Sequence, residues 1–315
     1  MLRAREPRML TAEKAARMLD ASGYEEAAKI IQECGYEDMS SMSASEIDSS
    51  LSLHRAAIMS ELDNLVPDKA LVGMFRLKYD YHNAKAVIKA EAMGLEPERL
   101  YSRSGRVAPE KIRSAFDEER LGDLPKALGA AIGEAASILA RTSNPQLADI
   151  ELDSAYFSEL LESAAELDNA FVTGYVRLLI DAANLKSAVR TARMKKSPEF
   201  LSSILIKGAA DVDRIASADG DGLCAIFSHS PLEKAAAAGS EAMSGGSMTA
   251  FERECDNAVN AYIRGAKLVS YGPEVVVSYL AAVENEITAV RMILTGALSG
   301  VPAETIRERL RDMYA

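Results

Sequence analysis

The chain has 315 residues, of which 48% are hydrophobic and 26% charged, close to the composition of an average soluble globular protein. This composition excludes a disordered tail and a collagen-like fibre. With 36 Lys and Arg against 47 Asp and Glu, the net charge is −11. Such an acidic balance argues against a nucleic-acid-binding protein, which needs basic surface to displace phosphate counterions.

Two helices are predicted in the first third of the chain. The segment LTAEKAAR, from Leu10, has the composition of a helix start. Residues 70–88 carry apolar side chains at steps of three and four, the spacing that buries one face of a helix. The members of this stripe are Ala70, Met74, Leu77, Tyr81, Ala84 and Ile88.

The middle third repeats both elements. VAPEKIRS, from Val107, has an early proline followed by Glu, which is favourable chemistry for a helix N-terminus. Residues 171–189 show the clearest apolar stripe: Phe171, Tyr175, Leu178, Ala182, Leu185 and Val189. Polar positions recur as well. Gly73, Asp80, Asn83 and Lys85 reappear 101 positions later as Gly174, Asp181, Asn184 and Lys186.

The last third contains a weaker third copy. It keeps Asn285 and also Arg291, the counterpart of Lys89 and Arg190, but it has Ala282 and Ile287 where the other copies have Asp and Lys. Its apolar stripe also includes Glu286. A loose helix start lies at Ala209, and a strong one, VPAETIRE, lies at Val301. An Asp-Asn dipeptide precedes each of the three copies.

These observations predict an all-α protein, because no segment shows the strict alternation of a strand and good helix formers dominate. The long repeat predicts three homologous helical lobes with approximate threefold symmetry, in residues 1–106, 107–198 and 199–315. We expect the last helix, starting near Val301, to pack back and close the array.

The recurring Asp-x-x-Asn pairs could bind a metal or a substrate, as in an all-α enzyme that uses Asp80 and Asp181 with a divalent cation. We favour a packing role, in which these side chains hydrogen-bond backbone groups of a neighbouring helix or loop. A catalytic pair seldom recurs at an equivalent place in a second lobe, whereas a packing device should.

The basic cluster Lys186, Arg190, Arg193, Lys195 and Lys196 also has two interpretations. Cations near a helix C-terminus are favoured by the helix dipole, which is the interpretation we prefer. The alternative is a contact patch for an anion or an acidic partner, formed by Arg190, Arg193, Lys195 and Lys196.

No other segment predicts catalysis. The three His residues are isolated, the DGDG at residues 219–222 is expected to be a turn rather than a calcium loop, and residues 235–247 resemble a flexible surface stretch. Phosphate loops, dinucleotide fingerprints and nucleophile elbows do not occur. We therefore expect no catalytic site, no metal and no cofactor.

The cysteines and the hydropathy indicate an intracellular protein. Cys34, Cys224 and Cys255 lie far apart, which is typical of reduced thiols. The longest uncharged stretch, residues 292–303, is shorter than the roughly 20 apolar residues of a membrane span. The charged N-terminus is unlike a signal peptide. Membrane contact is expected only through a partner.

Four segments together resemble the C subunit of the archaeal and bacterial V-type (A-type) ATPases, a family related to the d subunit of the eukaryotic vacuolar ATPase. They are LRAREPRMLTAEKAARML, KYDYHNAKAVIKA, IDAANLKSAVRTA and VENEITAVRMILTGALSGVPAETIRERLRDMY. The resemblance covers essentially the whole chain. It implies a funnel-shaped, three-lobed helical subunit without an active site.

The resemblance also implies partners. The protein would lie on the cytoplasmic face of the membrane rotor ring, and its central hollow would receive the foot of the central shaft, which the D and F subunits form. It would thereby join the shaft to the ring in an ATPase or ATP synthase that transports ions. The alternative is a helical-repeat scaffold of an unrelated complex, which would not bind the shaft.

Overall fold

The computed structural model describes residues 2–208 and 210–315. Ala209, where the loose helix start is predicted, lies outside the described residues. The described part of the chain consists of helices, turns and loops without a strand, so the predicted all-α class is confirmed. Across these residues, none of the helices is both long enough and apolar enough to cross a membrane.

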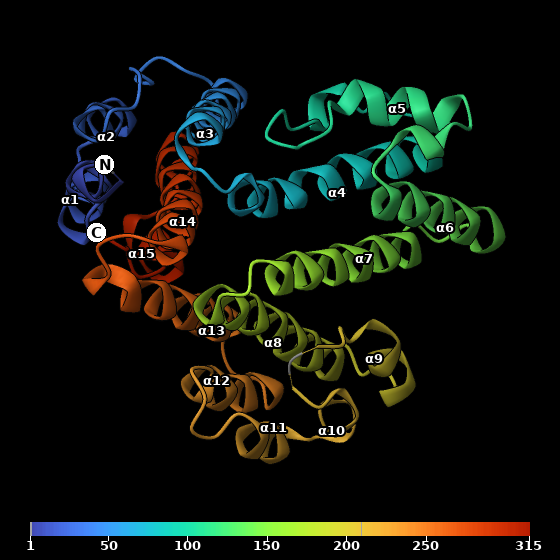
Figure 1. Cartoon of the computed structure of the whole chain (residues 1–315). Coiled ribbons are helices and arrows are strands. Elements are labelled where there is room, and N and C mark those ends of the chain that lie inside the picture. Colours follow the sequence, from blue (N-terminus) through green and yellow to red (C-terminus); the bar gives the residue numbers. More distant parts are fainter. Residues whose placement is uncertain (1, 209) are drawn as a thin grey trace.

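Six helices form three antiparallel pairs that surround the middle of the molecule (Figure 1). The pairs are α4 (Lys69–Met93) with α7 (Pro145–Glu166), α8 (Ala170–Arg193) with α13 (Met248–Arg264), and α14 (Pro273–Leu298) with α3 (Ala44–Leu65). Each pair joins helices that are not consecutive in the sequence. Each pair therefore joins two different thirds of the chain.

Shorter helices lie on the outer sides of the pairs (Figure 1). Those near α4 and α7 are α5 (Pro109–Asp117) and α6 (Lys126–Thr142). Those near α8 and α13 are α9 (Pro198–Ile204), α10 (Val212–Ser217), α11 (Gly220–Ile226) and α12 (Glu233–Met243). Those near α14 are α1 (Ala12–Leu19), α2 (Tyr24–Ile31) and α15 (Ala303–Arg309). Short 3₁₀ turns lie at Leu2–Ala4, Glu6–Arg8, Gln32–Cys34, Glu98–Leu100, Leu121–Asp123 and Gly265–Leu268.

The predicted helix starts are confirmed at three places. Thr11 caps α1, since its hydroxyl accepts a hydrogen bond from the backbone N–H of Lys14 at 3.2 Å. Pro109 is the first residue of α5, where its missing N–H costs nothing because the first turn has no intrahelical acceptor for it. Helix α15 begins at Ala303, directly after Pro302.

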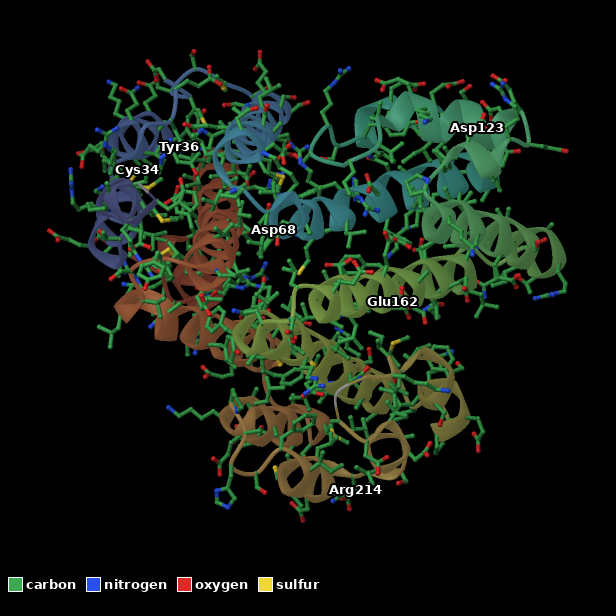
Figure 2. All side chains as sticks on the ribbon, in the orientation of Figure 1. Cys34, Tyr36, Asp68, Asp123, Glu162 and Arg214 are labelled. Atoms are coloured by element: carbon green, nitrogen blue, oxygen red, sulfur yellow. The ribbon has the colours of Figure 1, made fainter. Side chains whose placement is uncertain are left out.

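Both ends of the chain pack against α14 and against each other (Figure 1). The guanidinium of Arg3 donates to the hydroxyl of Tyr314 at 2.9 Å and to the carbonyl of Val269 at 2.8 Å. Helix α15 contacts α1, α13 and α14, as expected of a helix that folds back on the array. Cys34 and Tyr36 lie in this N-terminal part, beside α2 (Figure 2).

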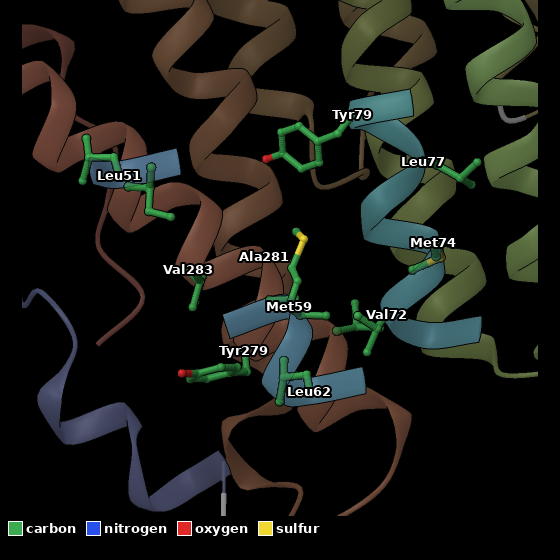
Figure 3. Packing of buried hydrophobic residues seen from close by; sticks show 14 of the residues in the cluster. Leu51, Met59, Leu62, Val72, Met74, Leu77, Tyr79, Tyr279, Ala281 and Val283 are labelled. Carbon is green, nitrogen blue, oxygen red and sulfur yellow. The ribbon is translucent and has the colours of Figure 1, made fainter. Parts of the chain in front are cut away.

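The largest hydrophobic core runs through the three pairs. Figure 3 shows Met59 and Leu62 of α3, Val72 of α4 and Val283 of α14 within it. A second core joins α8 and α13 to α9–α12 and includes Leu185 and Phe251. Most residues of the predicted apolar stripes are buried in these cores, but at the N-terminal ends of the stripes Ala70 is exposed and Phe171 is half-buried.

The prediction of a flexible surface stretch at residues 235–247 is wrong. Residues up to Met243 belong to α12, and Ala235 and Ala236 are fully buried. Gly239 allows this helix to approach its neighbours, because a Cβ there would lie 3.0 Å from Val189 Cγ2 and 3.1 Å from the ring of Phe251. Small residues that indicate flexibility in the sequence serve here for close helix packing.

The prediction of a simple turn at residues 219–222 is also wrong. Asp219 is the N-cap of α11, and its carboxylate accepts a hydrogen bond from the backbone N–H of Gly222 at 2.8 Å. The Asp at this position therefore starts a helix, although the two glycines that follow have low helix propensity.

Candidate functional site

Asn83 and Asn184 hold loops in the same way. The side chain of Asn83 exchanges two hydrogen bonds of 2.8 Å with the backbone C=O and N–H of Ser102. The side chain of Asn184 does the same with Ile206, at 2.9 and 2.8 Å. Both amides are fully buried. Asn83 thus anchors the loop after the 3₁₀ turn that follows α4, and Asn184 anchors the loop that follows α9.

Asp80 and Asp181 lie one helical turn before these asparagines on the same helices. Their carboxylates also bind backbone N–H groups of later segments. Asp80 is fully buried, and its carboxylate accepts from the N–H groups of Arg106 and Val107 at 2.8 and 3.0 Å. It also lies 2.6 Å from the Arg106 guanidinium. Asp181 accepts from the N–H of Ala210 at 2.8 Å. Burial raises the pKa of both carboxyl groups above their ordinary value. The expected bonding to neighbouring backbone is confirmed.

Asn285 binds a different segment. Its side chain donates to the carbonyl of Asp312 at 3.0 Å, beyond the end of α15. The neighbouring Glu286 is buried and accepts hydrogen bonds from the N–H of Leu10 and from the hydroxyl of Tyr36. In the third copy, the loop-anchoring Asp is therefore absent, and a buried Glu ties the N-terminal segment to α14 instead.

The recurring lysines form ion pairs across two of the helix pairs. Lys85 Nζ lies 2.5 Å from Asp153 on α7, and Lys186 Nζ lies 2.5 Å from Asp256 on α13. One turn further on, Lys89 lies 2.7 Å from Asp149, and the chain repeats the contact as Arg190 with Glu252 at 2.7 Å. These acidic partners were not recognised in the sequence. Their separation of 103 residues is the signal that could have revealed them.

The basic cluster at the end of α8 is largely engaged within the chain. Besides the pairs of Lys186 and Arg190, Arg193 donates to the carbonyl of Ala242 at 2.8 Å. Lys196 lies over the ring of Phe200, 5.9 Å from its centroid, and Lys195 is exposed. A contact patch at Arg190, Arg193, Lys195 and Lys196 stays a prediction.

A cavity of about 490 Å³ lies where the helix pairs converge. Helices α4, α7, α8, α13 and α14 all contribute to its wall. The lining repeats with the 101-residue period: Lys78, Tyr81, His82 and Lys85 from α4 correspond to Leu179, Ala182, Ala183 and Lys186 from α8. This volume falls in the range of about 300–1,000 Å³ that is typical of binding pockets.

Aromatic side chains form much of the cavity wall. Phe75 stacks on Tyr175 with 6.0 Å between ring centroids, and Tyr156 contacts both Phe157 and Tyr81, at 4.8 and 5.9 Å. Burial raises the pKa of Tyr156 and Tyr175. Both hydroxyls are therefore protonated and can donate at physiological pH.

Glu284 is the main charged group on the α14 side of the cavity. Its carboxylate accepts from the hydroxyl of Tyr79 at 2.6 Å and lies 3.6 Å from Lys78 Nζ. The buried guanidinium of Arg55 lies 3.0 Å from it, without the alignment of a hydrogen bond, and also covers the ring of Tyr79. Glu284 thus joins α3, α4 and α14 at one edge of the cavity.

Other parts of the molecule offer less for binding or chemistry. Within residues 2–208 and 210–315, no cluster of three or more His, Cys, Asp or Glu side chains could hold a metal ion. The three cysteines are free thiols. A second cavity of about 470 Å³, mainly apolar, lies between the turn from α3 to α4 and the start of α14. The central cavity is the only one of the two that helices from all three pairs line.

Comparison with known proteins gives one family and a small set of relatives. The sequence matches the family described as "ATP synthase (C/AC39) subunit" over residues 1–309. The C subunit of a V-type sodium ATPase from Enterococcus hirae is 21% identical over 276 residues, which cover 85% of this chain and 83% of the relative. The C subunit of a V-type ATP synthase from two strains of Thermus thermophilus is 24% identical over 176 residues, or 54% of each chain.

Proposed function

The chain belongs to the ATP synthase (C/AC39) subunit family, and from this premise we propose that it is a non-catalytic central-stalk subunit of a rotary V/A-type ATPase or ATP synthase. In this proposal it is the socket through which the rotating shaft is joined to the membrane rotor ring. The relatives, each named as the C subunit of a V-type enzyme, support the proposal.

The observation that carries the proposal is the central cavity. It is lined by helices from all three pairs, so an inserted segment would contact all of them at once. Two ion pairs, Lys85 with Asp153 and Lys186 with Asp256, tie neighbouring helices together at its wall. A socket that transmits torque needs a wall whose parts do not move apart under load. Long helices that are held together by ion pairs meet this need.

The partners follow from the same proposal. The D and F shaft subunits would occupy the cavity, and the ring would be contacted by the opposite surface, on the cytoplasmic face of the membrane. The membrane itself would be contacted only through the ring. We propose no cofactor and no active site for this chain.

The three-lobe arrangement is part of the proposal. Three equivalent ion pairs support it: Lys89–Asp149, Arg190–Glu252 and Arg291–Asp48 each join one helix pair. The lobe boundaries, 1–106, 107–198 and 199–315, stay predictions. Helices α1 and α2, which come first in the sequence, pack on α14 of the last third.

A binding measurement with a blocked cavity tests the function. Ala183 lines the cavity and is half-buried, so Ala183→Trp places a large ring inside it. We expect the unmodified chain to bind the purified D–F shaft pair, and A183W to bind at least tenfold more weakly. Ala237→Trp, at an exposed position of α12, is the matched control and should bind normally. Circular dichroism checks that both variants fold. Equal binding by A183W and A237W, or no binding by the unmodified chain, would contradict the proposal.

A further inference from the structure

The charged side chains that line the central cavity balance one another. The wall carries three lysines and three carboxylates: Lys78, Lys85, Lys186, Asp153, Asp256 and Glu284. With histidine counted as neutral, their formal charges sum to zero, although the whole chain has a net charge of −11. The cavity wall therefore carries no net charge that would attract an acidic or a basic partner.

The three carboxylates of the wall are already paired within the chain. Asp256 contacts Lys186 with one oxygen, at 2.5 Å, and the guanidinium of Arg311 with the other, at 2.8 Å. Glu284 is likewise shared by two cations, of which Arg55 is buried and lies 3.0 Å away. The third carboxylate, on α7, is held by one lysine at 2.5 Å. A basic side chain that enters the cavity therefore finds no free carboxylate among the described residues of the wall, and an acidic one has to displace a carboxylate from its lysine.

Most of the remaining wall is aromatic or aliphatic. Helices α4, α7, α8 and α13 supply these side chains, which include Phe75, Phe157, Leu160, Leu179 and Val259. The tyrosines of the wall are uncharged, because burial raises their pKa further above 10. A charged group placed among these side chains would lose water without gaining a counter-charge, which costs free energy. Apolar surface that is buried there lowers the free energy of the complex.

We propose that the part of the shaft received by the cavity is an apolar tip, a turn or helix end that carries aliphatic or aromatic side chains. The ion pairs of the wall stay intact when this tip enters, and the affinity comes from the burial of apolar surface. Binding is then nearly independent of salt, because the charges are paired within the wall and not across the interface. This inference rests on the proposed function, because it takes the D–F pair as the occupant.

Charges of both signs at one apolar position test the proposal. Leu179 lines the cavity and is half-buried. We expect Leu179→Asp and Leu179→Lys both to bind the D–F pair at least about fivefold more weakly, because each sets an unpaired charge against apolar surface. Leu179→Met stays apolar at a similar volume and should bind like the unmodified chain. A basic tip would instead bind L179D more tightly and L179K more weakly, and an acidic tip would do the reverse. Either of these patterns would overturn the inference.

Lys78 provides a second test at an exposed position, in case the charged variants of Leu179 do not fold. Its side chain is 59% exposed, and its Nζ lies 3.6 Å from Glu284, which keeps Arg55 as a partner when the lysine is replaced. Lys78→Met should bind the D–F pair as tightly as the unmodified chain or more tightly. Binding that is weaker by about tenfold would indicate an acidic tip and overturn the inference. Lys111→Met, at an exposed position of α5 outside the cavity, is the matched control.

The salt dependence of binding completes the test. The dissociation constant of the unmodified chain and the D–F pair is measured by calorimetry from about 0.1 to 1 M sodium chloride, over which the screening length falls from about 10 to 3 Å. We expect it to rise by less than about threefold. A larger rise would show that charges pair across the interface and would overturn the inference while leaving the socket function intact. If the unmodified chain does not bind the D–F pair at any salt concentration, the proposed function fails, and this inference fails with it.

Discussion

The guanidinium of Arg291 lies 2.6 Å from the carboxylate of Asp48, although the two residues are 243 positions apart in the sequence. The contact joins α14 to α3 at the positions that correspond, in the repeat, to Lys89 and Asp149, which join α4 to α7. The last long helix is thereby attached to the first, and the chain closes into a ring without a covalent link. Both members of the contact are partly exposed, so most of the stability of this junction comes from the apolar packing of α3 on α14.

Replacement of the loop-anchoring asparagines should destabilise the protein. Asn83→Ala leaves the buried C=O and N–H of Ser102 without partners, and each unsatisfied group costs about 1–3 kcal/mol. We expect the free energy of unfolding to fall by about 2–4 kcal/mol in N83A and by a similar amount in N184A, measured by urea denaturation. Asn64→Ala, on the exposed side of α3, is the control and should change it by about 0.5 kcal/mol or less. Equal effects at all three positions would contradict the anchoring role.

The two glycines that mark the repeat should respond to alanine in opposite directions. A Cβ at Gly73 would meet no atom within 4 Å, so Gly73→Ala should stabilise α4 by about 0.5–1 kcal/mol through its higher helix propensity. A Cβ at Gly174 would overlap the hydroxyl of Tyr262, which stacks on Phe171 and donates to its carbonyl. We expect Gly174→Ala to destabilise the protein by about 1–3 kcal/mol.

Thermal melting of the two glycine variants side by side checks this difference. G73A should melt at a higher temperature than the unmodified chain, and G174A at a lower one. A G174A variant that melts at a higher temperature than the unmodified chain would mean that Tyr262 can move aside without a loss of stability.

Glu286 should make stability depend on pH. Burial raises its pKa above the ordinary value of 4.5, although the N–H of Leu10, the hydroxyl of Tyr36 and the charge of Lys14 oppose this shift. A raised pKa in the folded state means that the folded protein binds the proton more tightly than the unfolded chain. The contribution of Glu286 to the free energy of unfolding is therefore complete below pH 4.5, and it is lost as the pH rises through the folded-state pKa. The loss is about 1.4 kcal/mol for each unit by which the pKa is raised.

The measurement is urea denaturation at several pH values between roughly 4 and 9. Relative to Glu286→Gln, the unmodified chain should lose stability as the pH rises and then reach a plateau. Glu25→Gln, at an exposed position of α2, should follow the unmodified chain. Parallel curves for the unmodified chain and E286Q would show that Glu286 does not titrate differently in the folded protein.

The proposed attachment to the rotor ring should weaken as salt rises. The three lobes of the proposed arrangement cannot match most ring stoichiometries one to one, so we expect the contact to be polar and hydrated rather than a rigid apolar key. Retention of the chain on rotor-bearing membranes, measured by sedimentation from low to high salt, should fall steadily because exposed ionic contacts are screened. Retention that does not change with salt would rule out a polar contact.

The sequence alone determined the features that depend on neighbours within one or two helical turns. The apolar stripes of α4 and α8, the Thr11 cap and the proline at the start of α5 follow from helical periodicity and from the unpaired N–H groups of a first turn. The packing role of Asp80 and Asn83 was also predictable, because the pair recurs at the same spacing in α8.

Tertiary structure alone decided which distant groups meet. Asp153 and Asp256 become the partners of Lys85 and Lys186, Gly239 lies against Val189 and Phe251, and the side chains of Tyr156 and Tyr175 line one cavity. These contacts join helices that are dozens to hundreds of residues apart. Their geometry is set by how whole helices pack, and the local sequence pattern of one helix does not indicate which face of another helix it will contact.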